Sequence, residues 1–492
     1  MTTISVADER TALDAVERRL FIGGQWRDAT GGGVMAVEDP ATGETLVEVA
    51  DATPEDADAA LAAADEAFAS FRTVAPRERG EILRRAYELM TERTEQLAIV
   101  MTLERGKPLA EARGEVAYAA SYLRWYAEEA VRINGRFQTA ENGGSRVLTM
   151  RQPVGPCLFI TPWNFPLAMG TRKVGPAVAA GCTSVVKPAK QTPLCMLAMA
   201  QIFEEAGLPA GVLNVVCGSS SGSLMAPLIA DPRLRKLSFT GSTAVGKQLI
   251  AQSSEQVLRV SMELGGNAPF IVFEDADLDL AIEGAMVAKM RNGGEACTSA
   301  NRFLVQDSIV DEFAKRLAER MGSMVVARGL EDDSQAGPLI DDVAVASVKE
   351  LVDDAVGWGA KLLCGGGPID GPGHFFAPTV LTDVSPGARI SNEEIFGPVA
   401  PIRSFSTEQD AISAANATEY GLVAYLFTRD IARGLRVIEG LETGMIGLNQ
   451  GLVSNAGAPF GGVKQSGYGR EGGHEGIDEY LSTKYVAINV AG

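Results

Sequence analysis

The sequence predicts a doubly wound α/β protein, and three observations support this fold class. From Pro153 onward, short apolar runs alternate with helical segments, and the runs at 157–160, 183–186, 214–217 and 237–240 are strand candidates. Strands that alternate with helices imply right-handed crossovers and a parallel sheet. The chain has 492 residues, 46% of them hydrophobic, which suffices for a large core and two or three domains.

The elements before this region are predicted to be mainly helical. Thr53 can cap a helix that begins at Pro54 and continues through an Ala-rich run to Phe71, with acids in its first turn. Helices then continue to about Arg132. Residues 146–151 alternate polar with apolar side chains, which predicts a half-exposed strand that can project from the body.

The elements after this region predict a second α/β unit. Thr192 is a candidate N-cap of a helix in the first unit. The apolar strand at 257–264 is broken by Gly265 and Gly266, which we interpret as a hinge, and strand 269–273 precedes a helix that Asp275 or Asp277 would cap. Residues 480–490 alternate again, which favours a strand that pairs with another subunit.

Composition excludes several classes of function. Sixty-three acidic and 44 basic residues give a net charge of -19, so we expect neither nucleic acid nor an anionic membrane surface as a partner. The first twenty residues lack the apolar core of a secretory signal, and no apolar run approaches the ~20 residues that span a bilayer. Six dispersed cysteines indicate a reducing compartment, so we expect a cytoplasmic protein.

Cys297 is the candidate nucleophile. It lies among the small and polar residues of 292–302, whereas the five other cysteines lie mostly in apolar or Gly-rich stretches. A reactive cysteine needs a polar setting that favours the thiolate, and we expect such a setting here. The alternative is a structural cysteine that packs as a small hydrophobe.

The base that accompanies this thiol is expected to be a carboxylate or a lysine. His374 and His474 are the only histidines, and both lie in Gly-rich loops where we expect them to be solvated. A His-dependent hydrolase and a zinc site are therefore not expected. Glu263 ends an apolar strand, where burial would raise its pKa, or backbone N–H groups would simply bind it.

Two loops after predicted strands can bind ligands. Residues 161–166 combine two prolines, two aromatic rings and Asn164, whose amide can donate to a developing oxyanion. Gly241 lies at a turn from strand into helix, where the helix N-terminus can hold a pyrophosphate. The first loop is rarer than the second, because strand-Gly-helix turns occur in many α/β proteins.

Together these motifs resemble the aldehyde dehydrogenase superfamily, and most closely its NADP-type succinate-semialdehyde dehydrogenase branch. The resemblance covers nearly the whole chain and includes Lys187-Pro188-Ala189, residues 393–399 and residues 459–464. It implies a Rossmann-type dinucleotide-binding domain at 1–128 and 150–263, a catalytic domain at 264–465, and oligomerisation strands at 129–149 and 478–492. It also implies a homodimer or homotetramer.

The resemblance implies a role for each candidate residue. Cys297 would attack the aldehyde, Asn164 and the Cys297 backbone N–H would form the oxyanion hole, and Glu263 would activate water to hydrolyse the thioester. The remaining cofactor contacts that it implies are Trp163, Lys187, Gly241, Ser242, Leu264, Glu394 and Phe396.

We expect cationic side chains to determine which cofactor and which substrate the protein binds. Members of the family that prefer NAD often carry Glu where this chain has Lys190, and a lysine there would attract a 2'-phosphate, so we expect NADP, with NAD possible. Arginines matching Arg172 and Arg291, with a serine matching Ser454, hold the far carboxylate of a short semialdehyde in the resembling branch. Each arginine viewed alone fits a salt bridge equally well.

Alternatives and departures from the family stay open at this level. The substrate can be succinate or glutarate semialdehyde, the thioester can pass to coenzyme A, and a non-catalytic relative of the fold is a third alternative. The family's usual Gln two residues before the nucleophile is Glu295 here, which can raise the thiol pKa or rotate toward solvent. Some relatives carry a second cysteine at the position of Ser299.

Overall fold

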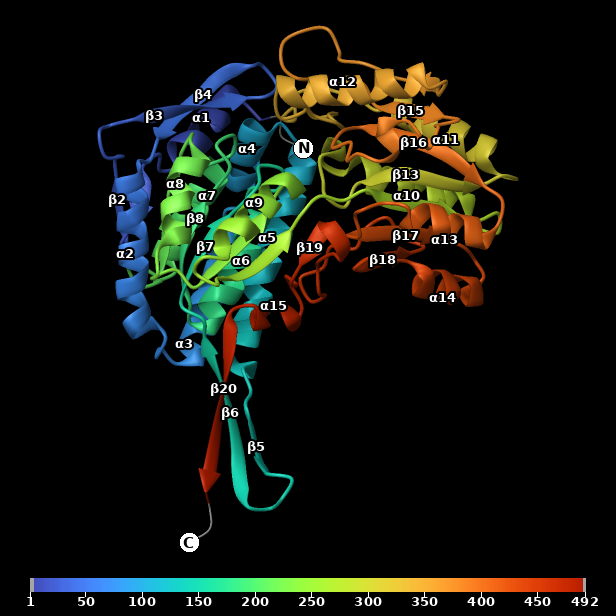
Figure 1. Ribbon diagram of the computed structural model, residues 1–492. Coiled ribbons are helices and arrows are strands. Elements are labelled where there is room, and N and C mark those ends of the chain that lie inside the picture. Colours follow the sequence, from blue (N-terminus) through green and yellow to red (C-terminus); the bar gives the residue numbers. More distant parts are fainter. Residues whose placement is uncertain (1–3, 490–492) are drawn as a thin grey trace.

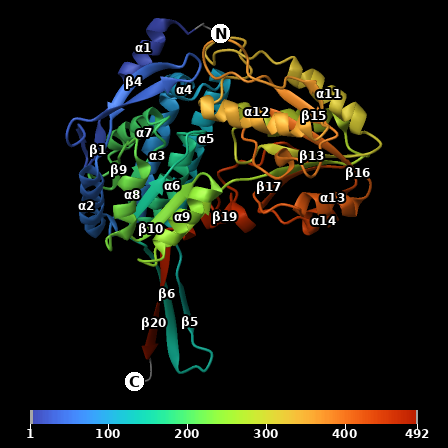
Figure 2. The same ribbon diagram turned by 45° about the horizontal axis from the view of Figure 1, so that its top comes forward.

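The computed structural model describes residues 4–489, which form two lobes built on parallel sheets and a narrow arm (Figure 1). The predicted α/β class with parallel sheets is confirmed. The first lobe holds most of the chain before residue 264, and the second lobe follows it. The view in Figure 2 again places the short strand β19 (Gly467–Tyr468) between the lobes.

The first lobe contains an eight-stranded sheet with the order β19-β11-β10-β7-β8-β9-β1-β2. Its five strands from β11 to β9 are parallel. Helices pack on this sheet, so its central strands are buried on both faces and read as continuous apolar runs. The strands are β1 (Leu20–Ile22), β2 (Gln25–Arg27), β7 (Pro156–Ile160), β8 (Thr183–Lys187), β9 (Leu213–Val215), β10 (Lys236–Thr240) and β11 (Arg259–Glu263).

The helices of the first lobe surround this sheet, and a two-stranded ribbon lies beside them (Figure 1). The helices are α1 (Val6–Asp14), α2 (Pro54–Phe71), α3 (Pro76–Glu92), α4 (Thr94–Arg105), α5 (Leu109–Glu129), α6 (Ala168–Ala180), α7 (Leu194–Glu205), α8 (Ser221–Ala230), α9 (Thr243–Ser253), the short η1 (Ala130–Arg132) and α15 (Glu475–Asp478). The ribbon consists of β3 (Val34–Asp39) and β4 (Glu44–Ala50).

The second lobe contains a seven-stranded sheet with the order β14-β15-β16-β13-β12-β17-β18, in which β14 alone is antiparallel. Its strands are β12 (Ala268–Val272), β13 (Ala300–Gln306), β14 (Lys361–Cys364), β15 (Thr379–Thr382), β16 (Val399–Phe405), β17 (Val423–Phe427) and β18 (Met445–Leu448). Its helices are α10 (Leu278–Met290), η2 (Arg291–Gly294), α11 (Val310–Gly322), α12 (Asp342–Gly357), η3 (Arg389–Ser391), α13 (Glu408–Asn416), α14 (Ile431–Gly440) and η4 (Lys464–Ser466).

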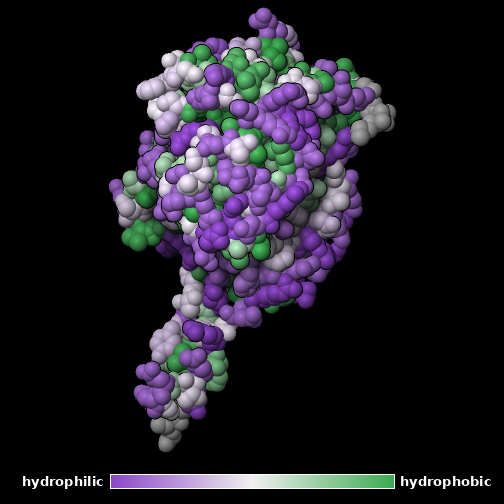
Figure 3. All heavy atoms as spheres, turned by 90° about the vertical axis from the view of Figure 1, so that its right-hand side faces the viewer, coloured by the Kyte–Doolittle hydropathy of each residue, from purple (hydrophilic) through white to green (hydrophobic). Residues whose placement is uncertain are grey.

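The arm consists of three antiparallel strands in the order β20-β6-β5. They are β5 (Arg136–Thr139), β6 (Ser145–Pro153) and β20 (Leu481–Asn489), so the predicted strands at 146–151 and 480–490 are confirmed, except that residue 490 lies outside the described part. The arm stands clear of the body (Figure 3). Its exposed aromatic rings include Phe137 and Tyr485.

The predicted helix N-caps are confirmed only where the capping side chain lies next to the helix in the sequence. Thr53 and Asp56 form the expected capping box, and Asp277 caps α10 as one of the two candidates. The prediction for Thr192 is wrong, because the first N–H groups of α7 are bound by the carboxylate of Glu104, at 2.7 Å and 2.9 Å. A carboxylate from another helix can satisfy these donors as well as an adjacent hydroxyl.

Gly265 and Gly266 connect β11 to β12 and so join the two lobes. A Cβ atom at Gly266 would lie 2.4 Å from the carbonyl oxygen of Cys297, so no larger residue fits at this crossing. Among residues 4–489, no helix is both long enough and apolar enough to cross a bilayer.

Candidate active site

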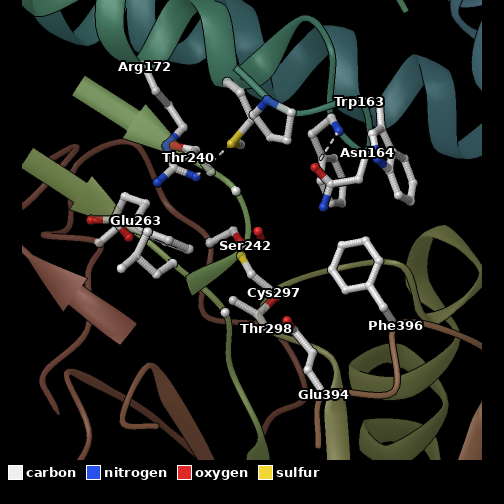
Figure 4. A pocket seen from close by; sticks show the side chains of 18 of the residues that line it. Trp163, Asn164, Arg172, Thr240, Ser242, Glu263, Cys297, Thr298, Glu394 and Phe396 are labelled. Atoms are coloured by element: carbon white, nitrogen blue, oxygen red, sulfur yellow. Dashed lines mark hydrogen bonds between the residues drawn. The ribbon is translucent and has the colours of Figure 1, made fainter. Parts of the chain in front are cut away.

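One cavity of about 240 Å³ lies between the lobes and collects twelve of the fourteen predicted ligand-binding and catalytic residues (Figure 4). These are Trp163, Asn164, Arg172, Gly241, Ser242, Glu263, Leu264, Arg291, Cys297, Glu394, Phe396 and Ser454. The first lobe contributes mainly the carboxyl ends of β7, β10 and β11, as expected for a doubly wound sheet. The second lobe contributes segments that precede β13 and β16.

Cys297 lies between η2 and β13, at the centre of the cavity wall in Figure 4. Burial raises the pKa of its thiol to about 12; Arg172 and Arg291 lower it, and Glu394 and Glu263 raise it. The expectation of a setting that favours the thiolate is therefore wrong. Low polarity and two carboxylates outweigh the two guanidinium groups.

Asn164 lies in the loop after β7 with its amide orientation fixed. Its Oδ1 accepts a hydrogen bond from the backbone of Phe165 at 3.1 Å, and its Nδ2 donates to the carbonyl of Glu295 at 3.0 Å. An amide nitrogen carries two hydrogens, so one donor is left over. The backbone N–H of Cys297 has no acceptor among the described residues, and it supplies a second donor.

Glu263 ends β11 and is 3% exposed. Neither of its carboxylate oxygens has a hydrogen-bond partner within the described residues, so the alternative in which backbone N–H groups bind it is wrong. Burial first, and then repulsion by Glu471, raise its pKa well above the ordinary value, although Arg172 and Lys173 oppose this. The raised pKa favours the neutral form of this carboxyl group more than in an ordinary glutamate.

The two arginines of the cavity differ in their partners. Arg172 on α6 is buried, forms an ion pair with Glu471 at 2.7 Å, and lies 3.9 Å from the centre of the Phe460 ring. Arg291 donates to the hydroxyl of Ser454 at 3.2 Å and has no carboxylate partner among residues 4–489. Arg291 is therefore the cation that is available to an anionic ligand.

Sequence reasoning did not identify several residues that line the cavity or contact its lining. Tyr118 and Phe165 flank the guanidinium of Arg291, at 5.8 Å and 4.7 Å from their ring centres. Phe165 lies in the loop that was singled out, whereas Tyr118 is on α5 and its only signal is the helical spacing to Tyr122. Glu471 had no local signal, because it reaches Arg172 from almost 300 positions away.

The cofactor side of the cavity contains a helix N-terminus and two rings. Ser242 caps α9, and a Cβ atom at Gly241 would lie 2.5 Å from the ring of Phe239, so the chain passes very close at this turn. Trp163 and Phe396 meet edge to face with ring centres 5.4 Å apart. Glu394 accepts a hydrogen bond from the backbone of Gly266 at 3.0 Å, and burial raises its pKa to about 7.

Lys187 and Lys190 lie outside this cavity. Lys187 ends β8 and is buried, which lowers its pKa to about 8. Lys190 is exposed and lines a second cavity of about 350 Å³, together with Ser219, Glu38, Glu104 and Asp341. Among the described residues it has no ion-pair partner.

Three further predictions are settled by burial and contacts. His374 is not solvated, because it is 8% exposed and lies between the carboxylates of Glu38 and Asp342. His474 is mostly exposed and bonds to Glu129. Glu295 is fully buried and bonds to Arg105, so it does not face solvent, and it is not among the groups that shift the pKa of Cys297 most.

Comparisons with known proteins agree with this geometry. Residues 26–486 match the model of the aldehyde dehydrogenase family. The chain is 62% identical to a succinate-semialdehyde dehydrogenase of Paenarthrobacter nicotinovorans, over 90% of this chain and 98% of that protein. It is 50% identical to a glutarate-semialdehyde dehydrogenase of Pseudomonas putida, over 96% and 98%. A crystal structure of an NADP-dependent enzyme of Escherichia coli superimposes with a TM-score of 0.96 at 49% identity, over 97% of this chain and 99% of that one.

The raised pKa of Cys297 predicts how the ligand-free protein reacts with iodoacetamide. Only the thiolate reacts, so the alkylation rate should rise about tenfold per pH unit from about pH 7 to 9 without a plateau. Mass spectrometry of the peptide that contains Cys297 would measure this rate, with Cys297→Ala as the control. A plateau below about pH 8 would contradict the pKa that burial imposes.

Proposed function

The chain belongs to the aldehyde dehydrogenase family, and from this premise we propose that it oxidises succinate semialdehyde to succinate, with NADP preferred over NAD. The observation that carries the proposal is Arg291, a cation that has no carboxylate partner among residues 4–489 and that bonds to Ser454 in the cavity that contains Cys297. A short semialdehyde has an aldehyde at one end and a carboxylate at the other. Cys297 would meet the first, and Arg291 with Ser454 would bind the second.

The dinucleotide fits the residues on the other side of the cavity. The N-terminus of α9 at Ser242, the close passage at Gly241 and the ring of Trp163 suit a pyrophosphate. Glu394 and Phe396 would hold the nicotinamide ribose and ring, and Leu264 lines the same cavity. When bound, the cofactor accepts the hydride that the substrate loses.

The protein's own groups perform the remaining steps. Cys297 releases its thiol proton to water, its thiolate sulfur forms a bond to the aldehyde carbon, and the carbonyl oxygen becomes an alkoxide bound by Asn164 and the backbone N–H of Cys297. Loss of hydride converts this adduct to a thioester. Glu263, once ionised, takes a proton from water, and the resulting hydroxide adds to the thioester carbon. The C–S bond then breaks, which releases succinate and returns Cys297 as a thiolate.

The preference for NADP rests on Lys190. It is exposed and has no ion-pair partner among the described residues, whereas the carboxylate of Glu104 in the same cavity already caps α7. A 2'-phosphate beside Lys190 would gain a charge-assisted hydrogen bond. The printed name of the similar Escherichia coli structure, an NADP-dependent enzyme, supports the same choice.

Glutarate semialdehyde is the second candidate substrate, because a relative that carries this name is 50% identical to the chain. It differs by one methylene group, a difference that pockets discriminate only modestly. Transfer of the thioester to coenzyme A is the remaining alternative for the second step. Glu263 favours water, since its carboxyl group lines the same cavity as Cys297.

We further propose a cytoplasmic homodimer or homotetramer that assembles through the arm. The exposed rings of Phe137 and Tyr485 lie on β5 and β20, whose outer edges have no partner strand among the described residues. Exposed edges of this kind pair readily with another chain. Absence of any association in sedimentation experiments on the full-length protein would contradict this assembly.

Glu263→Gln should separate the two halves of the reaction. Because an amide cannot take a proton from water, we expect a burst of about one NADPH per subunit, followed by turnover at least about 100-fold slower than that of the unaltered protein. Stopped-flow absorbance measures both phases. The raised pKa of Glu263 also predicts that activity falls with decreasing pH well before an ordinary glutamate would be protonated. Steady turnover of Glu263→Gln at the normal rate would exclude this role.

Arg291→Leu should weaken recognition of the substrate carboxylate. Loss of a charge-assisted hydrogen bond costs about 1.5–3 kcal/mol, so KM for succinate semialdehyde should rise about 10- to 100-fold, whereas KM for butanal should change little. Arg291→Lys is the matched control and should lie between these values. Equal effects of Arg291→Leu on both aldehydes would refute the carboxylate site.

Lys190→Glu should reverse the cofactor preference. The introduced carboxylate would repel a 2'-phosphate, so kcat/KM for NADP should fall at least about tenfold while the value for NAD stays the same or rises. Lys315→Glu, which places the same change on an exposed face of α11, is the control. A kcat/KM for NAD well above that for NADP in the unaltered protein would overturn the preference itself.

A further inference from the structure

The residue two positions before Cys297 belongs to a buried ion pair that the catalytic steps do not use. The carboxylate of Glu295 contacts the guanidinium of Arg105, the last residue of α4, and both side chains are at most 1% exposed. The second oxygen of Glu295 accepts a hydrogen bond from the backbone of Ile340 at 3.2 Å. The pair thus joins the first lobe to two separate segments of the second lobe.

The same pair holds the segment that carries the nucleophile. Arg105 also donates to the carbonyl of Asn292 at 3.4 Å, and Asn292 has a left-handed backbone conformation with φ of 58°. The side-chain amide of Asn292 donates to the carbonyls of Glu295 at 2.9 Å and of Asn164 at 3.1 Å. A bend of this kind in a residue other than glycine persists only where its surroundings enforce it.

The carbonyl of Glu295 also sets the oxyanion donor. Nδ2 of Asn164 donates one of its two hydrogens to this carbonyl, so the position of Glu295 determines where the second hydrogen points. A shift of the Glu295 backbone would move Asn164 and Cys297 relative to each other. Misplacement of about 1 Å can cost about 100-fold in rate when a catalytic geometry depends on it.

Arg105 reaches the cofactor side as well. Its guanidinium lies 5.1 Å from the centre of the Trp163 ring, which meets Phe396 edge to face. One guanidinium therefore contacts the ring on the cofactor side and the segment with the nucleophile. A buried ion pair contributes little net stability compared with apolar residues of similar size, but leaving one charge without its partner is costly.

We propose that Arg105 and Glu295 are positioning residues, which fix the segment 292–297 against Asn164 and Trp163. The thiol of Cys297, the amide of Asn164 and the ring of Trp163 then keep their relative geometry. The inference rests on the proposed function, because it assumes that Cys297 is the nucleophile. Neither side chain lines the cavity, so neither is expected to contact the substrate.

A double-mutant cycle tests this inference, with Arg105→Gln, Glu295→Gln and the variant that combines both. Each single variant leaves one buried charge unpaired, so we expect kcat to fall at least about tenfold, with KM for the aldehyde within about threefold. The combined variant replaces the ion pair by two amides that can bond to each other, and it should recover most of the lost kcat. Melting temperatures, measured first, ensure that every variant is folded at the assay temperature.

Arg27→Gln is the matched control, because it leaves the buried carboxylate of Asp56 without its cation in another part of the first lobe. A purely structural role would give Arg105→Gln and Arg27→Gln the same kinetics at equal loss of stability. Unchanged kcat in both single variants, or effects that add without recovery in the combined variant, would overturn the inference. If instead Cys297→Ala kept the normal rate, the proposed function would fail, whatever the cycle showed.

Discussion

The pKa of the Cys297 thiol depends on burial and on the charged groups around it, and the rest of the cavity is arranged around this balance. Burial and two carboxylates, Glu263 and Glu394, oppose ionisation of Cys297, while Arg172 and Arg291 favour it. The balance keeps the thiol of Cys297 protonated at neutral pH, and burial with repulsion by Glu471 also raises the pKa of Glu263. A thiol held in this state is protected from chance alkylation and oxidation, since both reactions require the thiolate.

The cavity depends on both lobes, because each lobe contributes some of the charged and polar side chains around Cys297. The first lobe supplies Asn164 and Glu263 from the ends of β7 and β11, and the second supplies Cys297 and Glu394 from segments that precede β13 and β16. The crossing at Gly266, where no side chain fits against the Cys297 carbonyl, brings these segments together. A cavity closed from two sides excludes water, and charges within it then act more strongly than at a surface.

Buried ionic contacts around the cavity supply the rigidity that such a site needs. Glu104 caps α7, and Lys107 pairs with Glu115 and also donates to the carbonyl of Asn164 at 2.9 Å. Together with Arg105 and Glu295, these groups come from the end of α4, the start of α5 and the segment before the nucleophile. Two buried ion pairs and one carboxylate that caps a helix thus lie close to the cavity. Side chains held by such contacts change position little when a ligand binds.

Much of the architecture could be predicted from local patterns, and so could the proposed reacting groups that the cavity brings together. The central strands from β7 to β11 appeared as apolar runs because both of their faces are buried. Thr53 and Asp277 could be identified because an N-cap satisfies donors in the next turn of its own chain. Cys297, Glu263 and Asn164 could be selected by residue type, by neighbours and by the resemblance to the family.

Only the tertiary structure decided the properties that depend on partners distant in sequence. The protonated state of Cys297, the pairing of Glu295 with Arg105, the burial of His374 and the cap that Glu104 provides all arise from residues far apart along the chain. The sequence by itself determined which chemical groups the protein carries and which segments become strands and helices, because these follow from side-chain type and local periodicity. A pKa or an ion pair depends instead on distance and on the exclusion of water, and folding alone sets both.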